Sequence, residues 1–202
     1  MTSPRIQRLI SLLTKLPGLG PRQAARLTYH ILDQNKDFAV QIAKNISEIH
    51  AVKRCALCFQ AHEETGQTCF ICMSPSRDQG TLMIVEKDTD LDTLEKTGVY
   101  NGKYFVLGGA ISPLQQESQK RLRLKELVAR VSFEKTLKEV ILGTSSTAEG
   151  DLTGRYIEKI LEPHITGKGN IKLTRLGRGL STGIELEYSD LETFKNAYQN
   201  RK

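Results

Sequence analysis

The sequence predicts an α/β protein in which a small helical region and a four-cysteine segment precede a parallel sheet covered by helices. Three observations lead to this prediction. The first 50 residues show only helical periodicity, all four cysteines occur in two C-x-x-C pairs, and short apolar runs alternate with helical stretches from Thr81 onward. Alternating strands and helices are typical of a parallel sheet with helices on its faces.

The length and composition are those of an ordinary water-soluble chain. A chain of 202 residues suits one medium-sized domain with a small additional one. Charged residues make up 26% and hydrophobic residues 39%. Because no apolar run has the length of a membrane span and no signal-peptide pattern precedes the first helix, we expect a cytoplasmic, nucleoid-associated protein without membrane contact.

The net charge of +6 is concentrated in the N-terminal quarter of the chain. Residues 1–54 contain nine Lys or Arg and three Asp or Glu, whereas residues 55–202 contain 20 of each kind. A local positive excess is typical of a surface that binds a polyanion such as nucleic acid. On charge alone, a basic helical face that is simply exposed to solvent explains the pattern equally well.

Apolar residues at helical spacing predict three helices before the first cysteine, over residues 4–16, about 21–33 and about 37–49. Pro17 ends the first of them. Pro21 suits the first turn of the second, where a missing N–H group costs nothing.

The turn between the first two helices contains Gly18 and Gly20, and the second helix continues with Arg22 and Arg26. This pattern is a helix–hairpin–helix, in which glycines let backbone N–H groups at the start of a helix approach a phosphate. The two arginines lie one turn apart and can flank the same phosphate. We therefore expect sequence-independent, salt-sensitive binding of single- and double-stranded DNA. The alternative is a plain turn between two helices.

All four cysteines lie in two C-x-x-C pairs separated by ten residues, at Cys55, Cys58, Cys69 and Cys72. Each pair offers two sulfurs from one turn, so the spacing predicts a closed tetrahedral site for one structural Zn²⁺ per chain. Two disulfides, or four unrelated thiols, are the alternatives. His62 lies between the pairs, and we expect it at the surface because four thiolates complete the site. The site is expected to act as a rigid joint between the basic helices and the sheet.

The remaining elements follow from the apolar pattern. Strands are predicted at 81–85, 104–107 and 139–142, with two more near 171–174 and 183–188. Helices are predicted at about 90–97, 116–131, 148–161 and 190–199. The glycine-rich segments 167–169 and 177–183 are expected to be loops.

Acidic residues follow two of the predicted strands, where ligands of a parallel sheet gather. Glu86 ends the first strand, and the segment 143–151 follows the third. This arrangement resembles the Toprim domain of topoisomerases, bacterial primases and related nucleases, whose second motif is Asp-x-Asp leading into Glu-Gly-Glu. The resemblance implies carboxylates that hold Mg²⁺ for phosphoryl transfer.

The second motif departs from that pattern. Ser145 and Thr147 occupy the Asp-x-Asp positions, while Glu149 and the following glycine are kept and Asp151 replaces the last Glu. Neutral hydroxyls are poor sole ligands for Mg²⁺, so we predict no catalytic residues. Acids at positions 88, 90 and 92 could substitute for the missing carboxylates. They could also form a solvated loop, or an acidic docking face for a basic partner.

The order of parts resembles the RecR family of bacterial recombination mediators. The residues that carry the resemblance extend over nearly the whole chain: Leu16-Pro-Gly-Leu-Gly-Pro21 with Arg22 and Arg26, the four cysteines, Glu86, Tyr104-Phe-Val-Leu-Gly-Gly-Ala-Ile-Ser-Pro-Leu114, Thr147-Ala-Glu-Gly150, and Arg178-Gly-Leu with Glu185-Leu-Glu-Tyr188.

The resemblance implies a non-enzymatic protein of recombinational DNA repair. Family members act with RecO, and with RecF where present, to help load RecA onto single-stranded DNA covered by SSB. They assemble as dimers and tetrameric rings that clamp DNA. Carried over by position, Gly18, Gly20, Arg22 and Arg26 would contact DNA. The acidic face formed by Glu86, Glu149 and Asp151 would bind RecO.

One segment departs from the family. Residues 115–118 replace the usual Gly-Ile-Gly-Pro-like turn and lead into a basic helix with Lys120, Arg121, Arg123 and Lys125. These basic residues form either a solvated face or an added DNA contact.

We expect four parts in this chain. Residues 1–53 form the helix–hairpin–helix DNA-binding domain, 54–77 the Cys₄ zinc finger, 78–175 the Toprim-like domain and 176–202 a short strand/helix segment. The rival hypotheses are a Mg²⁺-dependent Toprim enzyme that cleaves or joins nucleic acid, and a zinc-ribbon adaptor that binds only protein.

Overall fold

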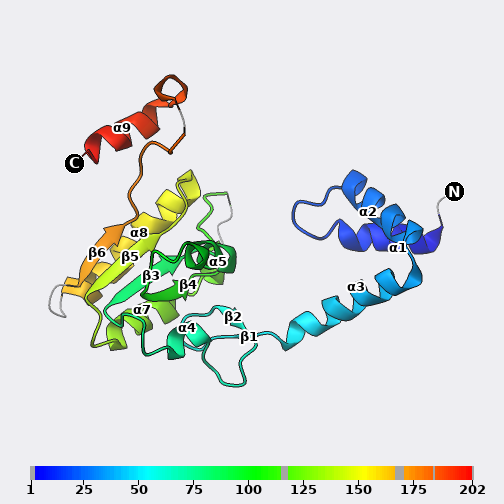
Figure 1. Cartoon of the computed structure of the whole chain (residues 1–202), viewed down its shortest axis with the longest axis horizontal. Helices are drawn as coiled ribbons and strands as arrows, with labels where there is room; N and C mark the ends of the chain where they lie inside the picture. The colour runs from blue at the N-terminus through cyan, green and yellow to red at the C-terminus, as the bar shows by residue number, and fades with distance from the viewer. Residues whose placement is uncertain (1–2, 115–117, 167–170, 184, 202) are drawn as a thin grey trace. The chain divides into compact units, whose positions relative to one another are not determined.

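The structure is a computed structural model that describes residues 3–114, 118–166, 171–183 and 185–201. The chain forms two compact units, Met1–Val52 and Lys53–Lys202 (Figure 1). We call them the helical unit and the α/β unit, and each is described by itself.

The helical unit contains α1 (Pro4–Leu13), α2 (Pro21–Asp33), α3 (Lys36–Glu48) and a 3₁₀ turn, η1 (Ile49–Ala51). Both α1 and α2 begin with proline, which is tolerated there because the first N–H groups of a helix have no partner within it. Asn35 caps α3 by accepting a hydrogen bond from the Phe38 N–H at 2.9 Å. The three predicted helices are confirmed.

The end of α1 differs from the prediction by three residues. The helix stops at Leu13, and i→i+3 hydrogen bonds continue the turn from Lys15 N–H to Leu12 O and from Leu16 N–H to Leu13 O. A proline disfavours the helical conformation of the residue before it, so Pro17 loosens the turn that precedes it.

The helical unit buries few of its side chains. Among its described residues, Ala24 and Thr28 are the buried ones. Large apolar side chains are exposed on all three helices, including Leu12, Leu32 and Ile46, and also at Leu16 after α1 and at Ile49 in η1. An apolar surface of this kind on so small a unit is typical of one that packs against a further surface.

The α/β unit is built on a parallel sheet of β3 (Thr81–Val85), β4 (Lys103–Val106), β5 (Glu139–Gly143) and β6 (Lys172–Arg175). The strand order is β4-β3-β5-β6, and each neighbouring pair is parallel. The predicted parallel α/β architecture is confirmed.

Each face of the sheet has its own core. Leu82, Ile84 and Phe105 point to one face, which is covered by α7 (Leu124–Phe133) and α8 (Ala148–Thr166). The alternate residues Met83, Val85, Tyr104 and Val106 point to the other face. That face is covered by α5 (Asp88–Thr97) and by three of the cysteines. Figure 1 shows α8 alongside β5 and β6.

The cysteine segment contains three short elements that the sequence pattern did not indicate. They are β1 (Lys53–Arg54), β2 (Ala61–His62) and α4 (Phe70–Met73). β1 and β2 form an antiparallel pair with Lys53 opposite His62 and Arg54 opposite Ala61. Two-residue strands are too short to produce a recognisable alternation in sequence.

The prediction of one continuous helix over 116–131 was wrong, because the helix is interrupted. The described part contains two helices, α6 (Ser118–Arg121) and α7, with Leu122 and Arg123 between them. Leu122 turns into the core, and the Arg123 N–H donates to Leu107 O at 3.0 Å, beyond the end of β4. This bond to the end of the strand replaces an intrahelical one.

The strand predicted near 183–188 was also wrong. Leu186–Tyr188 form a 3₁₀ turn, η2, and both ends of this turn are exposed. The apolar alternation resembled a strand, but within the described residues the segment pairs with no other strand. The final helix, α9 (Leu191–Gln199), agrees with the prediction, and Asp190 caps it. The predicted loop 167–169 lies outside the described residues.

No helix in the described part of the chain is long and apolar enough to cross a lipid bilayer.

Candidate functional site

The four cysteines converge on one point. The Sγ atoms of Cys55, Cys58, Cys69 and Cys72 all lie within 4.8 Å of one another, and the first three residues are buried. Four Zn–S bonds of about 2.3 Å place the sulfurs of a tetrahedral site roughly 3.8 Å apart. A small contraction of the cluster would therefore complete a metal site, and the residues fit a tetrahedral metal ion that prefers thiolates.

Local hydrogen bonds shape the two C-x-x-C turns. In the first, the Phe59 N–H donates to Cys55 O at 3.0 Å, and Phe59 has the left-handed φ of 63° that closes the turn. In the second, Cys69 precedes α4 and accepts from the Met73 N–H at 3.1 Å. The Cys69 N–H itself donates to Cys55 Sγ at 3.3 Å, which joins the two turns.

Contacts between the sulfurs separate the thiol pKa values. Cys58 Sγ and Cys69 Sγ lie 3.4 Å apart. Hydrogen bonds from Cys58 and Cys72 lower the pKa of the Cys69 thiol, while the same contact with Cys69 raises the pKa of Cys58. The cluster thus favours one thiolate even before a cation supplies the charge that would deprotonate the others.

The first cysteine turn is attached to the edge strand of the sheet. The Val106 N–H of β4 donates to Cys58 O at 2.8 Å. The Phe59 ring packs on Phe105 with centroids 5.4 Å apart, and the Arg123 guanidinium lies 5.1 Å over the same ring. The cysteine segment and Arg123 therefore cover an edge that would otherwise expose unpaired backbone groups.

The expectation that His62 lies at the surface was wrong. Its side chain is 3% exposed, and Nδ1 lies 2.6 Å from a carboxylate oxygen of Glu64. The prediction assumed that a histidine with no role in metal binding stays in solvent. Its position in β2, within the folded cysteine segment, buries it instead.

Asp88, at the start of α5, accepts hydrogen bonds from the cysteine segment. Arg54 Nη1 lies 2.6 Å from Oδ2, and the Ala61 N–H donates to Oδ1 at 2.8 Å. Burial raises the pKa of the Asp88 carboxyl, but hydrogen bonds from Arg54 and Ala61 outweigh it and the net pKa is lowered. Asp90 accepts from the Lys87 N–H at 2.9 Å. The carboxylates of Asp88 and Asp90 therefore both accept hydrogen bonds from groups of the same chain.

Glu86, the acid at the end of β3, is buried and held by the segment after β5. One carboxylate oxygen accepts from the Ser145 N–H at 2.9 Å and the other from the Ser145 hydroxyl at 2.8 Å. Ser145 occupies the first Asp-x-Asp position. In the Toprim pattern an aspartate there would bind a metal together with Glu86, but here the serine donates hydrogen bonds to Glu86.

Residue 150, which follows Glu149, must be glycine for steric reasons. A Cβ atom on Gly150 would lie 2.1 Å from Ser145 O and 3.0 Å from a Glu86 carboxylate oxygen. Only glycine lets the start of α8 approach the loop so closely. Glu149 itself is exposed on the first turn of α8, where a negative charge is favourable.

Asp151 is paired with two arginines from the C-terminal part of the chain. Arg175 Nη1 donates at 3.0 Å, and Arg178 donates with both of its terminal nitrogens, one of them at 3.1 Å. The Arg178 guanidinium lowers the pKa of the Asp151 carboxyl. This acid therefore anchors the segment after β6.

In the helical unit, the predicted DNA residues surround the turn between α1 and α2. A hollow of about 490 Å³ is lined by Gly18, Gly20, Pro21, Arg22 and Gln23. Gly18 has a φ of +80° and so requires glycine, whereas Gly20 has ordinary extended backbone.

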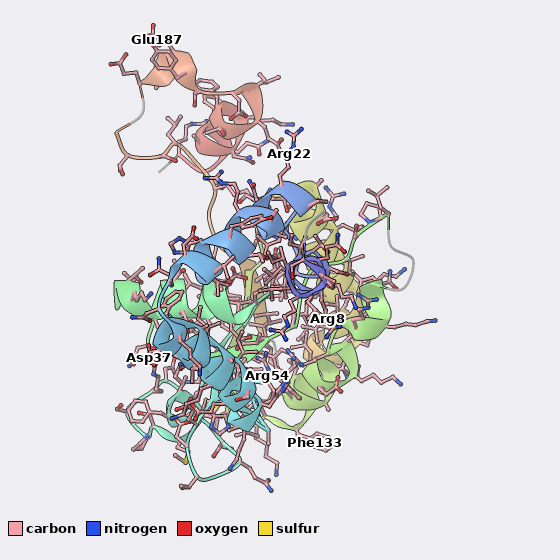
Figure 2. The ribbon with its side chains drawn as sticks, turned by 90° about the vertical axis from the view of Figure 1, so that its right-hand side faces the viewer. Arg8, Arg22, Asp37, Arg54, Phe133 and Glu187 are labelled. Atoms are coloured by element: carbon pink, nitrogen blue, oxygen red, sulfur yellow. The ribbon has the colours of Figure 1, made fainter. Side chains whose placement is uncertain are left out.

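The two arginines of α2 border neighbouring hollows. Arg22 is exposed at the start of α2, where its side chain projects away from the helix (Figure 2). Arg26 is also exposed and lines a second hollow of about 400 Å³, in which Gln23 again takes part. Gln23 escaped the sequence analysis because a neutral amide gives no charge or spacing signal.

The basic segment around α6 divides into two kinds of residue. Arg121 and Lys125 are exposed. Arg123 is half-buried, and its Nη1 donates to Val106 O at 2.8 Å. Arg123 therefore has a structural role at the sheet edge, and residues 115–117 lie outside the described part.

Two family models match this chain. The Toprim domain model matches residues 80–176, and the model described as "RecR, helix-hairpin-helix" matches residues 6–50. These ranges correspond to the parallel sheet with its helices and to the basic helical unit.

Similar proteins match over nearly their whole length. Recombination protein RecR of Gloeothece citriformis is 41% identical and covers 100% of this chain and 98% of its own length. The proteins of the same name from Desulfatibacillum aliphaticivorans and Lactobacillus acidophilus are 38% and 37% identical, and each covers at least 97% of this chain and 96% of its own length. The chain belongs to the RecR family of recombination proteins, with a role in DNA recombination and repair.

Proposed function

We propose that this protein is a DNA-binding recombination mediator without catalytic activity. It acts with RecO, and with RecF where present, to help load RecA onto single-stranded DNA covered by SSB. The observation that carries the proposal is the pair of exposed arginines beside the glycine turn of the helical unit. Two of the three Toprim-like acids, Glu86 and Asp151, accept hydrogen bonds from donors within the chain. Its site of action is the cytoplasm, at the nucleoid.

DNA contact is assigned to Gly18, Gly20, Arg22 and Arg26. The turn provides backbone N–H groups at the positive end of α2, and the arginines provide charge on both sides of one phosphate. Such contacts read the backbone, so single- and double-stranded DNA are both bound without sequence preference.

We predict that replacing Arg22 and Arg26 together by Ala weakens DNA binding and makes it less sensitive to salt. The slope of log K against log[salt] is negative. Loss of two phosphate contacts reduces its magnitude by about 1.8 for duplex DNA and about 1.4 for single strands. Fluorescence anisotropy over a salt series measures both slopes. The matched control replaces Lys159 and Lys195, two exposed lysines of the α/β unit, and should keep the parental slope. An unchanged slope in the arginine variant would remove these residues from the DNA site.

The absence of catalysis is argued from the acid site. Mg²⁺ sites for phosphoryl transfer need several carboxylates free to bind the ion. Glu86 accepts two hydrogen bonds from Ser145, and Asp151 is paired with Arg175 and Arg178. Glu149 is left exposed as a single acid of this motif. One carboxylate and two hydroxyls are a poor site for Mg²⁺.

We predict that the protein leaves supercoiled DNA unchanged in the presence of Mg²⁺. Gel electrophoresis after incubation with purified protein measures nicking and relaxation, and Glu86→Gln serves as the comparison after its folding is checked by circular dichroism. Nicking or relaxation that is present in the parent and absent in Glu86→Gln would favour the alternative, a Mg²⁺-dependent Toprim enzyme.

The metal bound by the four cysteines is assigned as one structural Zn²⁺ per chain. Four thiolates close the coordination sphere and leave no position for a substrate. Since the cysteine turns pack on β4 and the sheet core, the ion stabilises the fold of the α/β unit.

We predict about one zinc ion per chain in the purified protein, and less in Cys58→Ser, with a lower melting temperature. Atomic emission and thermal unfolding measure the two effects. Ser76→Ala, an exposed position in the same segment, is the control and should keep zinc and stability. Zinc-free protein that folds normally in a chelator would contradict the assignment.

The RecO-binding surface is assigned to the acidic edge of the sheet. Glu149 supplies its exposed charge, Glu86 supports the loop beneath it, and Asp151 orders the neighbouring arginines. Weaker RecO binding by Glu149→Lys, but not by Glu162→Lys on the last turns of α8, would support this surface.

The active form is assigned as a homo-oligomer, a dimer or a tetrameric ring, that clamps DNA. The helical unit supports this because Ala24 and Thr28 are its buried residues among those described, while Leu32, Ile46 and Ile49 are exposed. A second copy can cover such an apolar surface.

We predict a mass of at least two chains in solution, measured by sedimentation with and without DNA. A monomer at all protein concentrations, with DNA affinity retained, would contradict a clamp.

The four parts proposed for the chain are residues 1–53, 54–77, 78–175 and 176–202. The boundary after the helical unit is supported by the division of the chain after Val52.

A further inference from the structure

Lys103, the first residue of β4, is 3% exposed. Lysine is rarely buried to this extent unless its ammonium group has partners for all of its donors, because an unpaired buried charge is costly. Its burial beside the cysteine segment therefore needs an explanation.

The ammonium group donates three hydrogen bonds to the second cysteine turn. Nζ lies 2.8 Å from Ile71 O, 2.9 Å from Cys72 O and 3.1 Å from Ser74 O. An ammonium has three donors, so all of them are used. The acceptors are carbonyls at the end of α4, where the helix has no partners for them and where a cation is favourable.

These contacts leave the positive charge of Lys103 without an acid. In the part of the chain that the structure describes, no carboxylate forms an ion pair with this ammonium. Cys69 and Cys72 belong to the turn that Lys103 contacts, and a bound metal ion would convert both thiols to thiolates, which carry the opposite charge.

The charge of the metal centre would be opposite in sign to that of Lys103. One divalent cation with four thiolates carries two negative charges, and three of the four cysteines are buried. A buried anion of this charge is unfavourable unless donors or cations lie near it. The Cys69 N–H is one such donor, and it acts on the Cys55 sulfur of the first turn. Lys103 supplies a cation on the second.

We propose that Lys103 is a positioning residue of the metal centre: it holds the Cys69–Cys72 turn in its ligating conformation and partly offsets the negative charge of the metal–thiolate group. This inference rests on the proposed occupation of the four cysteines by a metal ion. Groups that support the ligands in this way usually change metal affinity when they are replaced.

Titration of the reduced, metal-free protein with Co²⁺ tests the proposal. Cobalt bound by four thiolates gives intense charge-transfer and visible bands, so the spectrum reports the ligand set as well as the affinity. Competition between Zn²⁺ and Co²⁺ then gives the zinc affinity. The variants are Lys103→Met, which keeps the length of the side chain without its charge, and Lys103→Arg, which keeps the charge.

We expect Lys103→Met to bind both metals about 10- to 100-fold more weakly with an unchanged four-thiolate spectrum, and Lys103→Arg to recover most of the loss. The control is Ile157→Val, in the core on the opposite face of the sheet, which should lower the melting temperature and keep the parental affinity. A merely structural role for Lys103 would make Lys103→Met behave like this control.

Parental metal affinity in Lys103→Met would overturn the proposal. If Lys103→Met does not fold, Lys103→Gln takes its place: weaker metal binding supports the proposal, and parental affinity overturns it. A parent protein that binds no Co²⁺ would instead refute the metal site itself, whereas a parent that binds Co²⁺ with the affinity of Lys103→Met would refute only the role of Lys103.

Discussion

The hydrogen bond from the Val106 N–H to Cys58 O joins the edge strand of the sheet to the cysteine segment, and much of the α/β unit depends on this contact. A parallel sheet is stable only when both faces and its edges are covered. Helices α7 and α8 cover one face. The other is shared between α5 and the cysteines, which lie in one core with Met83 and Val85. The cysteine segment is therefore a layer of the α/β unit.

The acids at this edge of the sheet have protein donors as partners, and Ser145 and Thr147 stand where the Toprim pattern has two further acids. In this chain each carboxylate oxygen of Glu86 accepts a hydrogen bond from Ser145, and Asp151 accepts from Arg175 and Arg178. Because residue 150 is glycine, the start of α8 can lie directly against both Ser145 and Glu86. Residues that resemble a metal site thus serve to order two loops and the C-terminal segment.

Patterns within one element were predictable from sequence, and contacts between distant elements were not. The apolar runs of β3, β4 and β5, the helical spacing of apolar residues in α1 and the proline at the start of α2 indicated those elements correctly. The spacing of the cysteines indicated their convergence. Apolar alternation misled at 183–188, because a strand also needs a neighbour to pair with. The break at Arg123 and the contacts of Lys103 depend on residues far away in the chain, which no local pattern records.

The ion pair between Arg54 and Asp88 has a mechanical consequence. Arg54 stands two residues after Val52, where the helical unit ends. The β1–β2 pair and the Arg54–Asp88 contact tie this point of the chain to the start of α5. They fix the backbone directly before Cys55, so the first cysteine turn begins from a segment that is already held in place.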